Sequence, residues 1–207
     1  MPKPRIELRQ RKAPRQQRSN DTVETLLAAA ARVLERESLA GFNTNRVAEV
    51  AGVSVGSLYQ YFPNKSALIA ALIDRHQSAL AERIEACVAA PRDGSLRQAV
   101  QALVEIGIEQ QYGRPLLAAA LDHEELRLPL GARIRESEQR MAASLAALLQ
   151  RHAAELDAPL RPTDVRDVFV IAKALIEADA MAGRVPPPDL RDRVVRALLG
   201  YLQTKQD

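Results

Sequence analysis

The sequence predicts an all-α protein with a small three-helix domain near its N-terminus and a larger helical domain behind it. Apolar residues recur at helical spacing along most of the chain, and alanine, leucine, valine and arginine dominate its composition. No segment shows the alternation that is typical of a strand. Glycine and proline interrupt the periodic segments at short intervals, and these interruptions predict where the helices end.

The composition excludes several classes of protein. With 207 residues, the chain has room for one or two domains and a sizeable core. No apolar run reaches the ~20 residues of a transmembrane helix, and no hydrophobic segment follows the basic N-terminus as it does in a secretory signal. Cys87 is the one cysteine, so an internal disulfide is excluded. We therefore expect a protein of the reducing cytoplasm.

Positive charge is concentrated at the N-terminus. Residues 1–19 hold seven basic residues and one acidic residue, whereas residues 66–207 hold 18 basic and 20 acidic residues. The seven are Lys3, Arg5, Arg9, Arg11, Lys12, Arg15 and Arg18. Three prolines lie in the same segment, and this composition predicts a disordered basic arm over residues 1–19.

The first predicted helix covers residues 22–38. Its apolar face is formed by Val23, Leu26, Leu27, Ala30 and Leu34, which follow helical spacing.

Two short helices joined by a glycine turn follow between residues 44 and 62. Thr44 is placed to cap the first by accepting hydrogen bonds from amides one turn further on. Val47, Val50 and Ala51 are expected to face the core. Gly52 stands where this helix ends, because glycine takes the left-handed C-terminal conformation at little cost.

The second short helix is expected to be capped by Ser54 and to point Leu58 and Phe62 inward. The residues left for its exposed side are small, polar or aromatic rather than charged: Val55, Gly56, Ser57, Tyr59, Gln60 and Tyr61. Glycine inside a helix costs about 1 kcal/mol relative to alanine, a cost that the close approach of another backbone or of DNA would explain. The pattern is typical of a helix-turn-helix that enters a DNA major groove; a generic helical corner is the alternative.

In this order and spacing, the motifs of residues 22–72 resemble the tetracycline-repressor (TetR) family of bacterial transcription regulators. The resemblance rests on Gly41-Phe42-Asn43-Thr44, Ala48-x-x-Ala51-Gly52-Val53-Ser54, Gly56-Ser57-Leu58-Tyr59-x-Tyr61-Phe62 and Asn64-Lys65-x-x-Leu68. It implies a homodimer with a DNA-binding domain, expected at residues 20–66, and a ligand-binding and dimerisation domain, expected at residues 67–207.

Contacts to DNA can be assigned to individual residues as hypotheses. Phosphate contacts are expected from Thr44, Arg46, Tyr59, Tyr61 and Lys65, the last at a helix start whose dipole attracts phosphate. Base contacts are expected from Val55, Gly56, Ser57 and Gln60. Gln60 can pair with adenine, and Val55 can contact a thymine methyl group.

A dimer places two recognition helices about 34–36 Å apart, which predicts a near-palindromic operator of double-stranded DNA. The basic arm either contacts DNA, along the backbone or in the minor groove, or serves only as a solubilising tail.

Further helices are predicted at residues 64–89, 95–111, 131–154, 163–182 and 189–203, with a shorter one ending near residue 126. Ser95 and Thr163 are expected to cap the helices that begin beside them. The last two carry apolar stripes that can pair with their twofold copy in a four-helix bundle. The candidate dimer-interface residues are Val168, Phe169, Ala172, Ile176, Val194, Val195, Leu198, Tyr201 and Leu202. Burial of the same residues within one monomer is the alternative.

The region from residue 66 to 184 is expected to enclose an apolar cavity for an unknown small molecule. Candidate ligand contacts are Gln110, Tyr112, His123, Glu124 and His152, although periodicity does not show which of them point inward. Adjacent residues diverge on a helix, so His123, Glu124 and Glu125 predict no metal site, and no cofactor is expected. His76 and Cys87 lie on an apolar stripe and are interpreted as core residues. A ligand contact for His76 and a redox-sensing role for Cys87 are the alternatives.

The sequence is compatible with two functional classes and disfavours a third. The leading hypothesis is a ligand-responsive repressor, in which the resemblance implies that ligand tilts the helix of residues 64–89 and separates the recognition helices. The second is a DNA-binding protein with an architectural or cell-division role and no inducer. An enzyme is disfavoured because the sequence offers no nucleophile–base set, glycine-rich phosphate loop or metal-ligand spacing.

Overall fold

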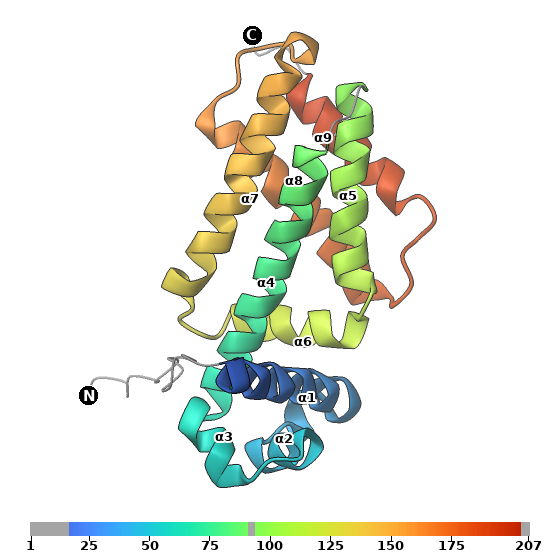
Figure 1. The fold of residues 1–207 in the computed structure, drawn as a ribbon. Coiled ribbons are helices and arrows are strands. Elements are labelled where there is room, and N and C mark those ends of the chain that lie inside the picture. Colours follow the sequence, from blue (N-terminus) through green and yellow to red (C-terminus); the bar gives the residue numbers. More distant parts are fainter. Residues whose placement is uncertain (1–16, 91–93, 204–207) are drawn as a thin grey trace, which may run out of the picture. The chain divides into compact units, whose positions relative to one another are not determined.

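The computed structural model describes residues 17–90 and 94–203, and these ranges form α-helices, one short 3₁₀ helix and no strand (Figure 1). The all-α prediction is therefore confirmed. The elements are α1 (Gln17–Gly41), α2 (Thr44–Ala51), α3 (Val55–Tyr61), α4 (Lys65–Ala89), α5 (Leu96–Tyr112), α6 (Pro115–Glu125), α7 (Gly131–Arg151), η1 (Ala153–Glu155), α8 (Pro162–Ala182) and α9 (Leu190–Leu202). Within the described ranges, no helix is long and apolar enough to cross a membrane.

The N-terminal arm predicted at residues 1–19 lies outside the described residues, except for its last three. The backbone of residues 17–19 is already helical, because α1 begins at Gln17 rather than at Thr22. At its other end α1 is interrupted at Ser38, which has φ 58° and ψ −178°, before one more turn leads to Gly41. The predicted helix end at residue 38 thus coincides with a backbone conformation that residues other than glycine rarely adopt.

Capping side chains fix several other helix ends. The Ser95 hydroxyl accepts from the amide of Gln98, whose side chain accepts in return from the Ser95 amide, so the expected cap of α5 is present. Asn64 Oδ1 accepts from the Ala67 amide at 2.8 Å and caps α4. The cap predicted at Thr163 is wrong. The preceding residue is a proline, which is favoured in the first turn because it has no amide hydrogen to satisfy, so α8 begins at Pro162.

The described chain divides into two compact units, neither of which is continuous in sequence. Among the described residues, the first unit contains 17–76 and 116–131, and the second contains 77–90, 94–115 and 132–203. Within α4 the change from one unit to the other falls between His76 and Gln77. The first half of α4, and α6 from Leu116 onward, group with the N-terminal helices.

The core of the first unit is built from the faces that periodicity predicts. Val23, Leu26, Leu27, Ala30 and Leu34 of α1 are all buried. α1 packs on α2, and α2 on α3 (Figure 1). Burial of this apolar area orients the two short helices, since neither is long enough to be stable alone.

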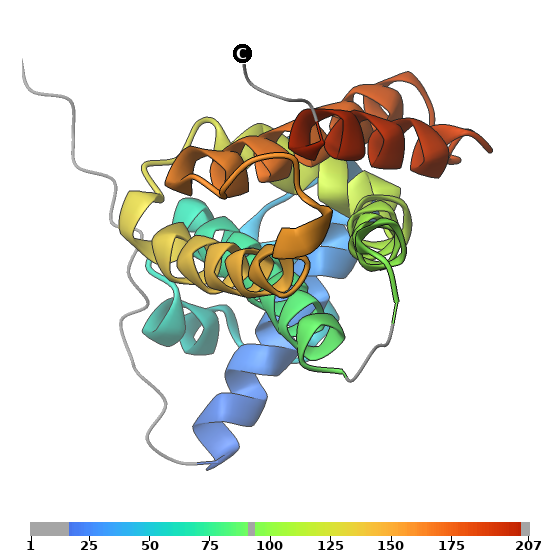
Figure 2. The same ribbon diagram turned by 90° about the horizontal axis from the view of Figure 1, so that it is seen from above.

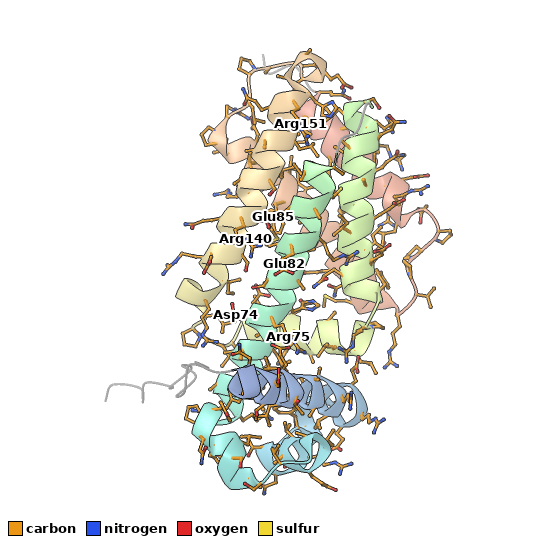
Figure 3. All side chains as sticks on the ribbon, viewed as in Figure 1. Asp74, Arg75, Glu82, Glu85, Arg140 and Arg151 are labelled. Atoms are coloured by element: carbon orange, nitrogen blue, oxygen red, sulfur yellow. The ribbon has the colours of Figure 1, made fainter. Side chains whose placement is uncertain are left out.

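The second unit is a helical bundle around one apolar cluster. Residues of α4, α5, α7, α8 and α9 contribute to it, and α5, α8 and α9 pack pairwise on one another. Figure 2 shows α8 and α9 running beside each other within this unit. Along α4 and α7, Arg140 binds both carboxylate oxygens of Glu85, at 2.8 and 2.6 Å, and Arg151 donates to the Val88 carbonyl at 2.7 Å (Figure 3). The hydrogen bonds from Arg140 lower the pKa of the Glu85 carboxyl.

Candidate nucleic-acid interface

The entry to α2 differs by one residue from the prediction. Asn43, not Thr44, is the N-cap, because its Oδ1 accepts from the Arg46 amide at 2.9 Å. Both residue types cap helices well, so adjacent candidates are hard to separate in a sequence. The Thr44 hydroxyl instead lies 3.0 Å from the hydroxyl of Tyr59 and joins α2 to α3.

The turn between α2 and α3 has the predicted geometry. Gly52 is left-handed, with φ 68° and ψ 28°, and its amide donates to the Glu49 carbonyl at 3.1 Å. Ser54 then caps α3 by accepting from the Ser57 amide at 3.0 Å. The turn is therefore closed by hydrogen bonds at both ends, which fixes the angle at which α3 leaves it.

The inner side of α3 carries Leu58 and Phe62, both fully buried as expected. Tyr61 is buried as well, at 8% exposure, so its predicted place on the exposed side is wrong. The reason is that α3 ends at Tyr61 and Phe62 is extended, with φ −122°. Consecutive side chains at a helix end do not keep helical spacing, and both can reach the core.

The outer side of α3 is uncharged. Val55 and Tyr59 are 37% and 40% exposed, Gly56 and Gln60 are exposed, and Ser57 is half-buried. A Cβ atom built on Gly56 would meet one described atom within 4 Å, the Ser54 hydroxyl at 3.8 Å. The described part of the chain therefore provides no close backbone approach that would explain the glycine.

Arg46 and Lys65, two of the predicted phosphate contacts, have partners inside the first unit. Arg46 Nε lies 2.6 Å from Glu37 of α1, and Nη1 lies 2.8 Å from Glu49. The hydrogen bond to Glu37, followed by that to Glu49, raises the pKa of Arg46. Lys65 Nζ donates to the Leu39 carbonyl at 3.0 Å.

The same ammonium lies 5.3 Å from the centre of the Phe42 ring, a cation–π distance. Lys65 thus holds the start of α4 against the end of α1. Sequence reasoning missed these partners because they come from segments up to 26 residues away.

Comparison with known proteins identifies this arrangement. Residues 26–72 match the model of the bacterial regulatory proteins of the tetR family, and residues 95–202 match the tetracyclin repressor-like C-terminal domain. The chain belongs to the TetR family. It is a DNA-binding transcription regulator with a helix-turn-helix in its N-terminal part.

Relatives match the TetR-family chain over different lengths. An uncharacterized HTH-type transcriptional regulator of Mycobacterium bovis is 26% identical over 192 residues, which cover 89% of this chain and 97% of the relative. The nucleoid occlusion factor SlmA of Haemophilus ducreyi is 41% identical over 66 residues, 32% of each chain. Among solved structures, the regulator FadR of Bacillus subtilis in complex with stearoyl-CoA has a TM-score of 0.69 at 19% identity, covering 86% of this chain and 97% of that one.

The five ligand candidates are divided between the two units. His123 and Glu124 lie in the first unit, and Gln110, Tyr112 and His152 lie in the second. His152 Nδ1 lies 2.8 Å from Glu155, whose carboxylate accepts from the amide that begins α5 at Leu96. Tyr112 is the last residue of the same helix and lies about 24 Å from Leu96, because a helix rises about 1.5 Å per residue. His152 and Tyr112 therefore cannot hold one small group.

Tyr112 differs from the other candidates because its hydroxyl oxygen is buried and has no hydrogen-bond partner among the described residues. Burial is the main cause that raises its pKa, and the neighbouring charge of Asp179 adds to the effect. A buried hydroxyl without a partner costs about 1–3 kcal/mol. This position is thus energetically unfavourable unless another molecule supplies an acceptor.

Most of the predicted dimer-interface residues are used within one chain. Val168, Ile176, Val194, Val195, Leu198 and Leu202 are buried in the second unit. Phe169, Ala172 and Tyr201 are half-buried. The periodicity identified buried positions correctly, but it could not show whether the covering surface belongs to the same chain. A different side of α8 exposes apolar residues at helical spacing, namely Val170, Ala174, Ala178 and Met181.

Proposed function

We propose that this TetR-family regulator is a ligand-responsive repressor that binds a near-palindromic operator as a dimer and is released by a small molecule. The observation that carries the proposal is the exposed, uncharged side of α3, presented by a turn whose two ends are fixed by Gly52 and Ser54. Side chains without charge suit the reading of base edges, because base pairs are told apart by hydrogen bonds and methyl contacts.

Within this surface, Gln60 and Val55 are the base readers in our proposal. Gln60 offers an amide that can pair bidentately with adenine, and Val55 offers an apolar surface for a thymine methyl group. The hydroxyls of Thr44 and Tyr59 lie 3.0 Å apart, so one donates to the other, and the hydrogen of the second can be donated to a phosphate.

Selection of genomic fragments by the purified protein, followed by sequencing, tests the proposal. A few near-palindromic sites support the repressor, and sequence-independent binding contradicts it. Gln60→Ala should then weaken binding to the selected site by about 1–3 kcal/mol and relax the preference at one base pair. Gln139→Ala is a matched control, because Gln139 is exposed on α7 in the second unit. Equal weakening of all sequences by Gln60→Ala would contradict base reading.

For the dimer, we propose the apolar stripe of Val170, Ala174, Ala178 and Met181 as the central contact. Val170 is 54% exposed and Met181 is 90% exposed, which is costly for an isolated chain in water. Two half-sites require two recognition helices, so a second copy of the chain is the occupant that the DNA-binding function needs. Val170→Glu should shift sedimentation from dimer to monomer, whereas Glu138→Gln on α7 should leave it unchanged.

The ligand proposal is supported by the Tyr112 hydroxyl and by the FadR neighbour, which was solved with stearoyl-CoA. Tyr112 would donate to an acceptor of the ligand from within an apolar cluster. A thermal-shift screen of small molecules, including stearoyl-CoA, tests this. Tyr112→Phe should weaken a bound compound by about tenfold while leaving the folded protein no less stable, since the hydroxyl has no partner to lose.

Release of DNA would act through α4, which begins in the first unit and ends in the second. The ligand must bind the DNA-free state better than the DNA-bound state, and coupling of about 1–3 kcal/mol is typical. Measuring ligand affinity with and without operator tests this directly. Equal affinities would rule the mechanism out.

An architectural or cell-division role is the alternative, and one observation favours it. The nucleoid occlusion factor SlmA is 41% identical to this chain over 66 residues. That match covers 32% of the chain. Many dispersed genomic sites, with affinity that no small molecule changes, would support this alternative over the repressor.

A further inference from the structure

Polar side-chain contacts join the second half of α4 to α7 at successive levels along the two helices. The first joins two hydroxyls 3.3 Å apart, the second is a bidentate ion pair, and the third is a hydrogen bond of 2.7 Å to a backbone carbonyl. Figure 3 shows the charged members of this series on α4 and α7. In order, the pairs are Ser78 with Ser137, Glu85 with Arg140, and Val88 with Arg151. They cover about 15 Å of α4, at 1.5 Å per residue.

The α4–α7 contacts are made by long side chains rather than by close backbone packing. The backbones of α5, α8 and α9 pack directly on one another, whereas those of α4 and α7 approach each other in few places. α4 also forms an ion pair with α5, between Arg83 and Glu109. Glu109 is 69% exposed, and exposed pairs contribute little. Arg140 and Glu85 are half-buried and bidentate, so theirs is the stronger of the two ion pairs.

The charges around Arg140 make this contact depend on one guanidinium. The hydrogen bonds to Glu85 are the main cause that raises the pKa of Arg140, and the charges of Glu82 and Glu136 add to the effect. Glu82 and Glu85 belong to α4, and Glu136 belongs to α7. Without Arg140, these carboxylates would lose the positive charge that they share, and like charges repel one another. Arg140 thus joins two helices whose acidic side chains would otherwise favour separation.

α4 is one continuous helix from Lys65 to Ala89, although its two halves belong to different units. Its first half contains fully buried side chains, among them Leu68, Ile69 and Ile73. Helices bend sharply mostly at proline or glycine, and α4 contains neither. A tilt of the second half is therefore carried to the first half, which begins only three residues after α3 ends.

We propose that Arg140 is a positioning residue for operator binding, because it holds the second half of α4 to α7 and so fixes the direction of the helix that follows α3. The inference rests on the proposed operator binding by a dimer, and it adds which side chain sets the separation of the two recognition helices. Half-sites lie about 34–36 Å apart on DNA, so both are matched only if α4 has one direction. Loss of the contact lowers affinity and also relaxes the demand for one half-site spacing.

Operators with altered half-site spacing test this role. Fluorescence anisotropy measures Kd for a selected operator and for two derivatives with one base pair added or removed at the centre, which moves a half-site by about 3.4 Å. Arg140→Met removes the charge and both hydrogen bonds but keeps an apolar chain. It should weaken binding at the native spacing and reduce the preference over the altered spacings by about fivefold, the lower end of typical coupling between sites.

Two further variants separate the ion pair from a general loss of stability. Glu85→Gln should have a smaller effect than Arg140→Met, because it breaks the pair and also removes one of the acidic charges. Adding Glu85→Gln to Arg140→Met should cause no further loss, since the two side chains form one contact. Arg191→Met is the matched control. It breaks an ion pair of 3.1 Å with Glu105 that joins α9 to α5 in the same unit, and it should leave affinity and spacing preference unchanged.

Hydrogen exchange of the free protein gives a second readout that needs no operator. Amides of residues 77–89 should exchange faster in Arg140→Met than in the wild type, because this half of α4 loses a contact with α7. Arg191→Met should leave their exchange unchanged.

Unchanged exchange in residues 77–89 of Arg140→Met would overturn the inference. Wild-type affinities, or an equal loss of affinity for all three spacings, would overturn it as well, because a contact that only stabilises the fold does not change the spacing preference. Failure of the proposed function gives a different result, namely wild-type protein that prefers no site and no spacing. The exchange comparison would still show whether Arg140 holds α4.

Discussion

Replacing Gly56 by alanine should make the protein more stable and at the same time a weaker DNA binder. Gly56 lies inside α3 on its exposed side, and its φ is not in the left-handed region. The conformation therefore does not require glycine. The described residues offer no internal reason for this glycine, and the DNA contact that we propose for this side of α3 would supply one.

The expected stability gain follows from the surroundings of the missing Cβ. Its nearest described neighbour would be the Ser54 hydroxyl at 3.8 Å, an ordinary van der Waals contact. Alanine therefore adds no clash and recovers the conformational entropy that glycine loses, about 0.5–1 kcal/mol. For a unit of this size that gain raises the melting temperature by about 2–8 °C. In the complex with DNA, the alanine methyl group would lie between α3 and the DNA surface that it contacts. It should reduce the binding free energy by at least about 1.4 kcal/mol, which is a tenfold loss of affinity.

Thermal unfolding by circular dichroism and anisotropy titration of the selected operator measure the two effects. Ala147→Gly, on the exposed side of α7, is the matched control. It should cost about 1 kcal/mol of stability and leave operator affinity unchanged. Operator binding by Gly56→Ala as tight as wild type would refute the idea that DNA explains the glycine. A destabilised Gly56→Ala would refute the open surroundings seen in the structure.

The remaining predictions concern the fold. Ser38→Gly should raise the free energy of unfolding by about 1 kcal/mol, because φ 58° and ψ −178° favour glycine; a loss in urea unfolding would contradict this backbone conformation. Asn43→Ala should lower the free energy of unfolding by about 1 kcal/mol in the same assay, because it removes the cap of α2. Thr44→Ala should lower it by less. The hydrogen bond from Arg161 is the main cause that lowers the pKa of Asp164 below 3.8 in the folded protein. The carboxylate therefore contributes its full stabilisation above pH 3.8, and this stabilisation is lost as the pH falls through the pKa of the folded state. Asp164→Asn should therefore be less stable than wild type at neutral pH, and the difference should shrink in acid; a constant difference would argue against the ion pair.

The local chemistry of the sequence predicted the turn well. Gly52, Ser54, Leu58 and Phe62 each have the predicted role, because capping, left-handed glycine and helical spacing depend on residues within one or two turns. The prediction that Tyr61 is exposed is wrong because α3 ends at this residue, and helical spacing does not hold beyond the end of a helix.

Roles that depend on distant partners could not be predicted in this way. Arg46 was expected to contact a phosphate, but it forms a salt bridge with Glu37 of the preceding helix. The stripe containing Val194 and Leu198 was recognised as apolar, yet the surface covering it is α5 and α8 of the same chain. Packing partners are set by the tertiary fold, and neither charge nor periodicity identifies them.

The discontinuity of the first unit has a consequence for synthesis on the ribosome. The unit needs residues 116–131, so it is incomplete when His76 has been made. Another 55 residues must be added before residue 131 is reached, which takes about 3–11 seconds at 5–20 residues per second. During that interval the first unit is without the residues of α6 that complete it. A nascent chain stalled near residue 80 should therefore be more open to proteolysis than one stalled after the second unit has emerged.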